Sequence, residues 1–386
     1  MNLIKHDIKI QLGDKIKEYE RRLKQEKILT LHTTDHVEHI AAYIAWSNIG
    51  GNIFVKHANL PKEPSEYLDE KIKDFNVQNS VLFHTSGTTG LPKIVINKEK
   101  HFYQSGNMAT KVINWSNDTK FLNFLPAFTT GFWHIIIPTF IKHPTSTMVL
   151  GSRETIVKDL ESDTNSVILV PALLDQLKMR GIPLNFSKYE RVGCGASAPQ
   201  QRHARIVFEN GGNRFNNMYG ASEICSPILS RMTTHVDDDP TYLNFASNGD
   251  SEIKLENNEL CVRGPTVCET YDDWYQTGDL FEKKDNLVKF IGRNNEIIKI
   301  NGYTASLLMI ETTVEDRLGL GESRAILRNR AGSDFIEVEY TNKDINIDKK
   351  LFHKKLETTL SYCCIPAKYT LVDSIPKNAL GKKLRS

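Results

Sequence analysis

The stretch HTSGTTGLPK, residues 84–93, gathers hydroxyl side chains, glycines and a lysine into one loop. Apolar residues on both sides, 80–83 and 94–96, predict two short strands that flank it. Hydroxyls donate hydrogen bonds, and glycines let main-chain N–H groups turn toward an anion. The stretch therefore predicts a phosphate-binding loop, whose contributing residues are Thr85, Ser86, Gly87, Thr88, Thr89, Gly90 and Lys93.

This loop differs from the common P-loop, in which a lysine directly follows the second glycine and a helix comes next. Here Leu91 and Pro92 intervene, and Ile94 follows Lys93 in a strand-like run. A generic P-loop ATPase is therefore disfavoured. The ordinary alternative is a polar turn between two strands, and the rest of the chain has to decide between the two.

Four further stretches place charged or hydroxyl residues beside glycines. NNMYGASE (216–223) ends in a serine and an acid, and YQTGDL (275–280) puts an aspartate after a Thr-Gly turn. GRNNEIIKINGY (292–303) contains an arginine and a lysine, and PKNALGKKLR (376–385) has a lysine directly after a glycine. Such residues can bind phosphates, ribose hydroxyls and a metal ion.

In this order and spacing the five stretches resemble the motifs of the adenylate-forming superfamily. That superfamily includes acyl- and aryl-CoA ligases, adenylation domains of nonribosomal peptide synthetases and firefly luciferases. The resemblance runs from about residue 80 to the end of the chain. It implies an α/β fold with a large N-terminal domain of mostly parallel sheets, residues 1–294, shortened at its N-terminus. A small α+β C-terminal domain, residues 295–386, would rotate between two reaction steps.

The resemblance also implies a two-step reaction that uses ATP and Mg²⁺. A carboxylate attacks the α-phosphate, which gives acyl-AMP and pyrophosphate, and a pantetheine thiol then displaces AMP to form a thioester. The acceptor would be coenzyme A or, as the alternative, a phosphopantetheinyl carrier protein. The chain is thus expected to be an acid–thiol ligase acting on a small carboxylic acid.

Residue roles carried over from the superfamily follow the charges involved. The loop 85–93 would hold the β- and γ-phosphates, and Glu223 would bind Mg²⁺ as an oxygen ligand. Tyr219 would pack on adenine, and Ser222 would reach the α-phosphate. The ribose hydroxyls would bind Asp279, with Arg293 assisting there or ordering the hinge.

Lys382 would lie between the attacking carboxylate and the α-phosphate, where a fixed cation offsets the repulsion of two anions. After domain rotation, the face around Lys299 and Gly302 would replace it and admit the pantetheine arm. The hinge would lie at Asn295, where the superfamily usually has aspartate. Asparagine keeps the turn preference and loses the charge.

Aromatic and small residues suggest where the acid binds. In LPAFTTGFW (125–133), Thr129 stands where many relatives have histidine, and the aspartate that binds an α-ammonium group is missing. Amino acids are therefore disfavoured, and a small aryl or medium acyl acid fits better. The candidate pocket residues, for which ordinary core packing is the equal alternative, are Phe128, Phe132, Trp133, Gly195 and Ala196.

Composition narrows the function classes further. The 386 residues include 49 basic and 47 acidic side chains, a net charge of +2, which argues against nucleic acid as the main partner. No run approaches the roughly 18 apolar residues of a membrane span. The start of the chain has no signal-peptide core, and the six cysteines form no C-x-x-C pair. A cytoplasmic enzyme that does not enter the membrane is expected.

Periodicity supports the α/β class. Helices are expected at 14–27, 36–48, 100–115, 171–178, 200–208 and 351–360. A strand is expected at 53–55, a buried strand at 167–170, and a strand followed by a loop at 189–195.

Only about 80 residues precede the phosphate loop, which indicates a subdomain trimmed between Leu60 and Asn79. One wall of the acid pocket is then either open or borrowed from a second subunit, and a homodimer is a hypothesis. A pseudoenzyme that binds nucleotide without chemistry is the remaining alternative. It is disfavoured because a decayed enzyme would have no reason to keep all five charged residues, which are Lys93, Glu223, Asp279, Arg293 and Lys382.

Overall fold

The structure is a computed structural model that describes residues 2–5, 8–58, 60, 62–85, 92–271, 273–300, 303–330, 333–360, 362–377 and 383–384. The chain forms two compact units. The first comprises Met1–Lys254, Cys261–Thr277 and Asp285–Val288, and the second comprises Leu255–Leu260, Gly278–Lys284 and Lys289–Ser386.

The largest element of the first unit is an eight-stranded sheet with the order β12-β11-β10-β9-β7-β8-β1-β2. Its neighbours are parallel except for the two edge pairs, β11 with β12 and β1 with β2. The strands are β1 (Asn2–Lys5), β2 (Ile8–Lys9), β7 (Lys120–Asn123), β8 (Thr147–Leu150), β9 (Ser166–Leu169), β10 (Arg191–Cys194), β11 (Phe215–Tyr219) and β12 (Leu229–Thr233).

A second sheet of the first unit has the order β3-β4-β5-β6. Strands β3 (Leu29–Leu31), β4 (Asn52–Val55) and β5 (Ser80–Thr85) are parallel, and β6 (Lys93–Asn97) returns antiparallel to β5. Side chains alternate between its faces: Val81 and Phe83 belong to one core cluster, and Leu82 belongs to another. The sheet is therefore buried on both sides, as its apolar strands require.

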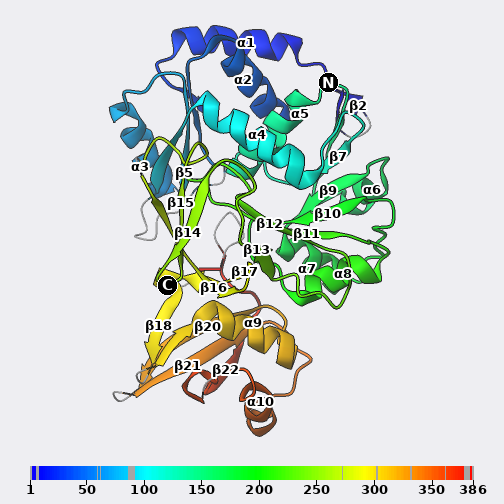
Figure 1. The fold of residues 1–386 in the computed structure, drawn as a ribbon, viewed down its shortest axis with the longest axis vertical. Helices are drawn as coiled ribbons and strands as arrows, with labels where there is room; N and C mark the ends of the chain where they lie inside the picture. The colour runs from blue at the N-terminus through cyan, green and yellow to red at the C-terminus, as the bar shows by residue number, and fades with distance from the viewer. Residues whose placement is uncertain are drawn as a thin grey trace. The chain divides into compact units, whose positions relative to one another are not determined.

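Helices fill the space between the two sheets and cover their outer faces (Figure 1). The inner helices are α2 (His36–Ile49), α4 (Glu99–Ile113) and α5 (Ile137–Lys142), with α1 (Gly13–Gln25) packed against α2. The short helices α3 (Lys62–Lys71) and η1 (Ile72–Asp74) cover the four-stranded sheet. The outer face of the larger sheet carries α6 (Ile156–Glu161), α7 (Pro171–Met179) and α8 (Gln201–Glu209).

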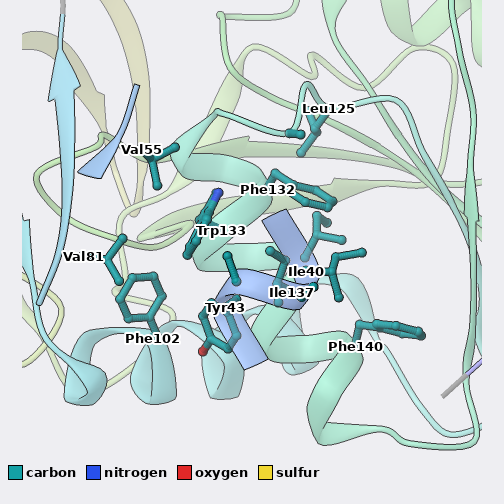
Figure 2. Close-up of a cluster of buried hydrophobic side chains, with 14 of the residues drawn as sticks. Ile40, Tyr43, Val55, Val81, Phe102, Leu125, Phe132, Trp133, Ile137 and Phe140 are labelled. Carbon is teal, nitrogen blue, oxygen red and sulfur yellow. The ribbon is translucent and has the colours of Figure 1, made fainter. Parts of the chain in front are cut away.

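Helix α2 is hydrophobic on nearly every side because it lies in the middle of these layers. It begins at Asp35, whose side chain accepts a hydrogen bond from the Val37 N–H at 3.1 Å. An N-cap of this kind satisfies one of the free donors at a helix start. Figure 2 shows Ile40 and Tyr43 of α2 in one cluster with Trp133 and with Val55 and Val81 of the four-stranded sheet. The same cluster contains side chains of the eight-stranded sheet, among them Phe121 and Met148.

The second unit builds its core on the three-stranded sheet β20-β21-β22. Its strands are β20 (Ser323–Arg330), β21 (Ser333–Tyr340) and β22 (Lys368–Leu371), and the hairpin of β18 (Ile297–Ile300) and β19 (Tyr303–Ser306) precedes them. Helices α9 (Leu307–Leu318) and α10 (Lys349–Leu356) and the turn η4 (Tyr362–Cys364) bury apolar side chains against this sheet. Ser306 caps α9 by accepting the Met309 N–H at 3.2 Å.

A five-stranded sheet has the order β13-β17-β16-β15-β14. Its strands are β13 (Tyr242–Asn244), β14 (Glu252–Glu256), β15 (Glu259–Arg263), β16 (Tyr275–Lys284) and β17 (Leu287–Arg293), and η3 (Asn294–Glu296) follows them. Among the helices of the described residues, none is long and apolar enough to cross a membrane.

The expected α/β class with mostly parallel sheets and a separate C-terminal α+β part is confirmed. The expected helices and strands lie within a few residues of their observed bounds, and the widest difference is α10, which ends at Leu356 rather than near 360. The interval that looked shortened, 60–79, holds α3 and η1. The division at residues 294 and 295, the rotation and the homodimer stay predictions.

The first unit buries several histidines in apolar surroundings. Burial lowers their pKa from about 6.5 because the charged form loses its hydration. The pKa falls to about 4 for His39, His57, His84 and His101, and to about 3 for His134, beside whose ring Phe83 and Phe102 lie. These histidines are therefore neutral in the folded protein at neutral pH.

We expect the free energy of unfolding to fall as the pH drops from about 6.5 toward 4. In that range the unfolded chain binds protons that the folded chain excludes, so stability decreases with decreasing pH. Each histidine contributes at most about 1.4 kcal/mol per pH unit. Urea unfolding between pH 4.5 and 7.5 measures this slope. His134→Phe should make it shallower, the exposed His235→Gln should not, and equal slopes in wild type and His134→Phe would contradict the assignment.

Candidate active site

The phosphate-loop stretch lies at the end of the β5–β6 hairpin. Thr85 pairs with Lys93 at the last rung of the ladder, so the two ends of the loop lie side by side. Lys93 is exposed and Thr85 is half-buried. The loop residues Ser86, Gly87, Thr88, Thr89 and Gly90 lie outside the described residues.

Three other candidate segments follow the carboxyl ends of parallel strands in the eight-stranded sheet. Phe128 follows β7, Gly195 and Ala196 follow β10, and Tyr219 ends β11. Strands β10 and β11 are neighbours, and β9 separates β10 from β7. In open α/β sheets ligands bind at this edge. The topology therefore collects the candidate adenine and acid residues at one end of the sheet.

A hydrogen bond joins two of these segments directly. The hydroxyls of Thr130 and Ser222 lie 3.0 Å apart, although they are 92 residues apart in the chain. At the neighbouring strand, a Cβ at Gly195 would lie 3.1 Å from the Met218 carbonyl oxygen. The backbone after β10 thus runs close to the end of β11, which favours a residue without a side chain there.

The turn that carries Ser222 and Glu223 is tight and tied to the phosphate hairpin. A Cβ at Gly220 would lie 2.2 Å from the Ser226 carbonyl oxygen, so the turn needs glycine at this position. Cys225, with φ of +59°, donates from Sγ to Oδ1 of Asn97, the last residue of β6, across 2.6 Å. The acidic turn therefore lies directly beside the strand that leaves the loop.

Backbone hydrogen bonds from Cys268 and Glu269 also hold this turn and the neighbouring β6. The Cys268 N–H donates to the Glu223 carbonyl oxygen at 2.9 Å, and the Glu269 N–H donates to the Ile96 carbonyl oxygen at 3.1 Å. Cys225 and Cys268 pack together with Val95 in a small buried cluster. Burial raises the pKa of the Cys225 thiol well above its ordinary value, with a further contribution from the negative charge of Glu223. Cys225 is therefore a packed, protonated structural residue.

The side chain of Glu223 is half-buried, and no Lys or Arg in the described part of the chain pairs with it. Burial raises the pKa of the Tyr271 hydroxyl, and the charge of Glu223 adds to that rise. A half-buried carboxylate without a cationic side chain is the donor that a hard divalent cation prefers. The residues present therefore fit Mg²⁺ at Glu223.

The strand that enters the loop contacts His57, whose ring packs against Phe128. His84 directly precedes Thr85, and its Nε2 accepts the backbone N–H of His57 at 3.1 Å. The rings of His57 and Phe128 lie 3.7 Å apart. Burial lowers the pKa of His84, and the neighbouring His57 and Lys56 lower it further because protons bound to these groups would repel one another. Neutral His84 therefore links the loop to the segment that carries a candidate acid-binding aromatic.

Phe132 and Trp133, by contrast, are core residues. Both side chains are completely buried, and Trp133 Nε1 donates to Nδ1 of His39 at 2.9 Å (Figure 2). They belong to a short π-helix, Phe132–Ile136, that continues into α5. Of the two readings left open by the sequence, the structure favours packing for this pair. Thr129 uses its hydroxyl locally, donating to the Pro126 carbonyl oxygen at 2.7 Å.

In the second unit, Asp279 and Arg293 lie together. Asp279 is 3% exposed, and Arg293 Nε lies 2.8 Å from its Oδ1. The glutamate Glu259 supports the same place: one carboxylate oxygen accepts the Gly278 N–H at 2.7 Å, and the other accepts Nδ2 of Asn294 at 2.9 Å. Gly278 has φ of +71°, which suits the turn before Asp279.

The other candidates of the second unit are Lys299, Asn295, Gly302 and Lys382. Lys299 lies exposed on β18, opposite Thr304 of β19, and Asn295 is in the η3 turn. Gly302 and Lys382 lie outside the described residues. Reasoning from the sequence missed His57, His84, Asn97, Thr130 and Glu259, none of which belongs to the five quoted motifs apart from His84 at the edge of the loop.

Comparison with known families decides the class of the protein. The model of a family described as AMP-binding enzyme matches residues 56–272, more than half of the chain. The chain belongs to the family of AMP-binding enzymes. The resemblance to the adenylate-forming superfamily is thereby confirmed, and with it the expected class of enzyme, an AMP-forming acid–thiol ligase.

Relatives of this AMP-binding enzyme include two kinds of protein. The 2-succinylbenzoate–CoA ligase of Staphylococcus aureus is 24% identical over 355 residues, which are 85% of this chain and 70% of that protein. Tyrocidine synthase 3 of Brevibacillus parabrevis is 24% identical over 359 residues, 78% of this chain and 5% of that protein.

Solved structures of the same fold cover nearly the whole AMP-binding enzyme. O-succinylbenzoate coenzyme A synthetase (MenE) from Bacillus subtilis, in complex with ATP and magnesium ion, has a TM-score of 0.81 at 17% identity. The match covers 100% of this chain and 95% of that one. ATP-bound MatB from Rhodopseudomonas palustris has a TM-score of 0.84 at 16% identity, over 99% of this chain and 93% of that one. At these identities the likeness establishes the fold.

Proposed function

We propose that this AMP-binding enzyme activates a small carboxylic acid with ATP and transfers the acyl group to coenzyme A. In the first step a carboxylate oxygen attacks the α-phosphorus, and the bond to the β-phosphate breaks with release of pyrophosphate. In the second step the thiol, after losing its proton, attacks the acyl carbonyl carbon, and AMP leaves. The product is an acyl or aryl thioester.

The observation that carries this proposal is the bond between Cys225 and Asn97. It ties the turn of Ser222 and Glu223, the proposed metal ligand, to β6, the strand that leaves the loop 86–91. The Thr130–Ser222 bond brings in the segment of Phe128 from the other side. These two contacts support our assignment of the acid, phosphate and metal functions to the first unit.

The residues of the first unit have distinct roles in this proposal. Thr85, Lys93 and the loop between them hold the β- and γ-phosphates, and Glu223 holds Mg²⁺, which neutralises phosphate charge when bound. Ser222 donates its hydroxyl toward the α-phosphate, and Tyr219 packs against adenine. Phe128, Gly195 and Ala196 bound the acid.

The residues of the second unit orient the nucleotide and contribute to both reaction steps, adenylation and thioester formation. Asp279 accepts the ribose hydroxyls, and Arg293, 2.8 Å away, holds that carboxylate in place. Lys382 stabilises the charge that develops when carboxylate and α-phosphate meet. Lys299, Gly302 and the hinge at Asn295 serve thioester formation.

The names of similar proteins suggest the acid. The Staphylococcus aureus relative is named a 2-succinylbenzoate–CoA ligase, and one structure of this fold is an anthranilate CoA ligase in complex with anthranoyl-AMP. A small aryl acid also suits the Phe128–His57 contact, because a second aromatic ring can pack at this edge. Coenzyme A is the proposed acceptor, since the relatives that match over most of their own length are CoA ligases.

Pyrophosphate release from ATP and Mg²⁺ tests this function. The panel contains 2-succinylbenzoate, anthranilate, benzoates, cinnamates, fatty acids and amino acids, each with and without coenzyme A. We expect release with an aryl or acyl acid, stimulation by coenzyme A and no response to amino acids. If a phosphopantetheinyl carrier protein stimulates pyrophosphate release and coenzyme A does not, the carrier protein is the acceptor in place of coenzyme A. ATP binding without release for every acid would overturn the proposal.

A further inference from the structure

The two residues that follow β4 are fixed at the carboxyl edge of the four-stranded sheet. The Lys56 N–H donates to the Leu31 carbonyl oxygen of β3 at 3.0 Å, and the His57 N–H donates to Nε2 of His84 on β5 at 3.1 Å. Strands β3 and β5 are the two neighbours of β4. The backbone at residues 56–57 is therefore held from both sides.

The side chains of Lys56 and His57 leave the chain toward opposite faces of this sheet, as successive residues of an extended chain do. Lys56 is directed to α3, where its Nζ lies 2.6 Å from Oδ1 of Asp69, and its side chain is 4% exposed. The ring of His57 lies 3.7 Å from that of Phe128, which packs against the core cluster containing Val55. The ammonium group next to His57 in the chain is thus paired and directed away from Phe128.

The contact between His57 and Phe128 carries no charge. His57 is 5% exposed, and burial lowers its pKa to about 4, with a further decrease from the neighbouring His32. The imidazole is therefore neutral at neutral pH. Phe128 is half-buried, unlike the completely buried Phe132 that follows it. The pair thus remains open to a ligand on the side of Phe128.

This aromatic pair belongs to the segment that contacts the proposed α-phosphate ligand. Thr130, two residues after Phe128, places its hydroxyl 3.0 Å from that of Ser222. In the proposed first step the carboxylate of the acid reaches the α-phosphate. The remainder of the acid then extends from there toward the residues that bound it, among them Phe128.

We propose that His57 is a specificity-determining residue, which forms with Phe128 an uncharged aromatic wall that selects aryl acids with a single carboxylate. An aromatic ring gains from packing against other rings, beyond the area that it buries. A second carboxylate would lose hydration at this wall without gaining a cationic partner. This role rests on the proposed function and names its acid as a benzoate-like or anthranilate-like monocarboxylate rather than the dicarboxylate 2-succinylbenzoate.

Two matched pairs of acids isolate the features of the wall. Benzoate and cyclohexanecarboxylate have rings of similar size, and one of them is aromatic. The succinyl methyl ester of 2-succinylbenzoate and 2-succinylbenzoate itself differ in one negative charge. In acid-dependent pyrophosphate release by the wild type, kcat/KM should favour the first member of each pair, by roughly 3–10-fold for the aromatic ring.

Variants of His57 assign these preferences to its ring. His57→Ala should raise KM for benzoate roughly 3–10-fold and leave KM for cyclohexanecarboxylate and for ATP near wild type. His57→Phe should keep the aromatic preference, and it serves as the test if His57→Ala fails to fold. His57→Arg supplies a fixed charge and should improve kcat/KM for 2-succinylbenzoate relative to its ester. His235→Ala, which removes an exposed histidine of the same unit, should change none of these values.

Calorimetric binding of sulfamoyl analogues of benzoyl-AMP and cyclohexanecarbonyl-AMP gives a readout that does not depend on turnover. Wild type should bind the benzoyl analogue more tightly, and His57→Ala should lose that preference.

Three results would overturn the aromatic wall and leave the proposed function standing. These are a wild type that does not prefer benzoate to cyclohexanecarboxylate, a wild type that prefers 2-succinylbenzoate to its ester, and equal losses for both ring acids in His57→Ala. A wild type that binds ATP but releases no pyrophosphate with any acid would overturn the proposed function, and the role of His57 with it.

Discussion

Replacing Lys382 by alanine is expected to lower acid-dependent pyrophosphate release by roughly 10²–10³-fold. The first step brings a carboxylate and a triphosphate together, and both are anions. A fixed ammonium group stabilises the charge on the attacking and bridging oxygens as the bond forms. Single-turnover release from ATP and Mg²⁺ measures the loss directly, because it excludes the later thiol step.

Two comparisons make this result specific. Thioester formation from synthetic acyl-AMP and coenzyme A should be nearly unchanged in Lys382→Ala, and ATP should still bind, because the phosphate loop and Asp279 are intact. Lys382→Arg should recover little, since the planar guanidinium does not place its charge where a compact ammonium group does. Wild-type release by Lys382→Ala would remove this residue from the chemistry and leave Lys93 as the main phosphate cation.

The strands and helices around the loop could be predicted from local patterns alone. The apolar run 80–83 and the run 94–96 became β5 and β6 because each is bounded by residues that break a strand. Asp35 marked the start of α2, and Pro171 the start of α7, since each satisfies the geometry of a first helical turn. These signals act within a few residues and need no tertiary information.

The contacts that assemble the site could not be predicted in this way. Thr130 with Ser222, and Asn97 with Cys225, are 92 and 128 residues apart in the chain. They meet because of strand order, and neither pair has a local signature. A single sequence shows that a threonine or a cysteine is present, but the sheet decides what lies opposite it.

Phe132 and Trp133 illustrate a second limit. An aromatic run has the same composition whether it lines a pocket or fills a core. Here the neighbouring α2 presents His39 and Tyr43, and the indole N–H of Trp133 is used within the core. Phe128, only four residues earlier, packs instead beside the loop strand. Whether each of these aromatic side chains faces the core or the loop depends on where α2 and β5 lie, and the local sequence does not contain that information.

Glu259 was missed for a different reason. It opens β15 in a stretch that reads as a pair of ordinary short strands, and a charged residue at a strand start is common. Its importance comes from holding Gly278 and Asn294 at the same time, one beside Asp279 and the other beside Arg293. The carboxylate of Glu259 thus links β16, which carries Asp279, to the residue that follows Arg293 at the end of β17.

That geometry leads to the second large effect, the Asp279→Asn variant. Hydrogen bonds to a charged group contribute about 1.5–3 kcal/mol, so losing the carboxylate should raise KM for ATP roughly 10–150-fold. The turnover number should change less, because the ribose contacts persist from ground state to transition state. Steady-state pyrophosphate release at varied ATP concentration gives both constants.

The nucleotide itself supplies the decisive control. Wild type should discriminate strongly between ATP and 2′-deoxyATP, because Asp279 accepts the ribose hydroxyls. Asp279→Asn should lose most of this discrimination. Asp273→Asn, which alters an exposed acid 3.6 Å from Arg263, should keep it. Asp279 is almost fully buried beside Arg293, so its loss could also weaken the fold of the second unit. A lower melting temperature with full discrimination would assign Asp279 to stability alone, whereas lost discrimination at an unchanged melting temperature requires contact with the ribose.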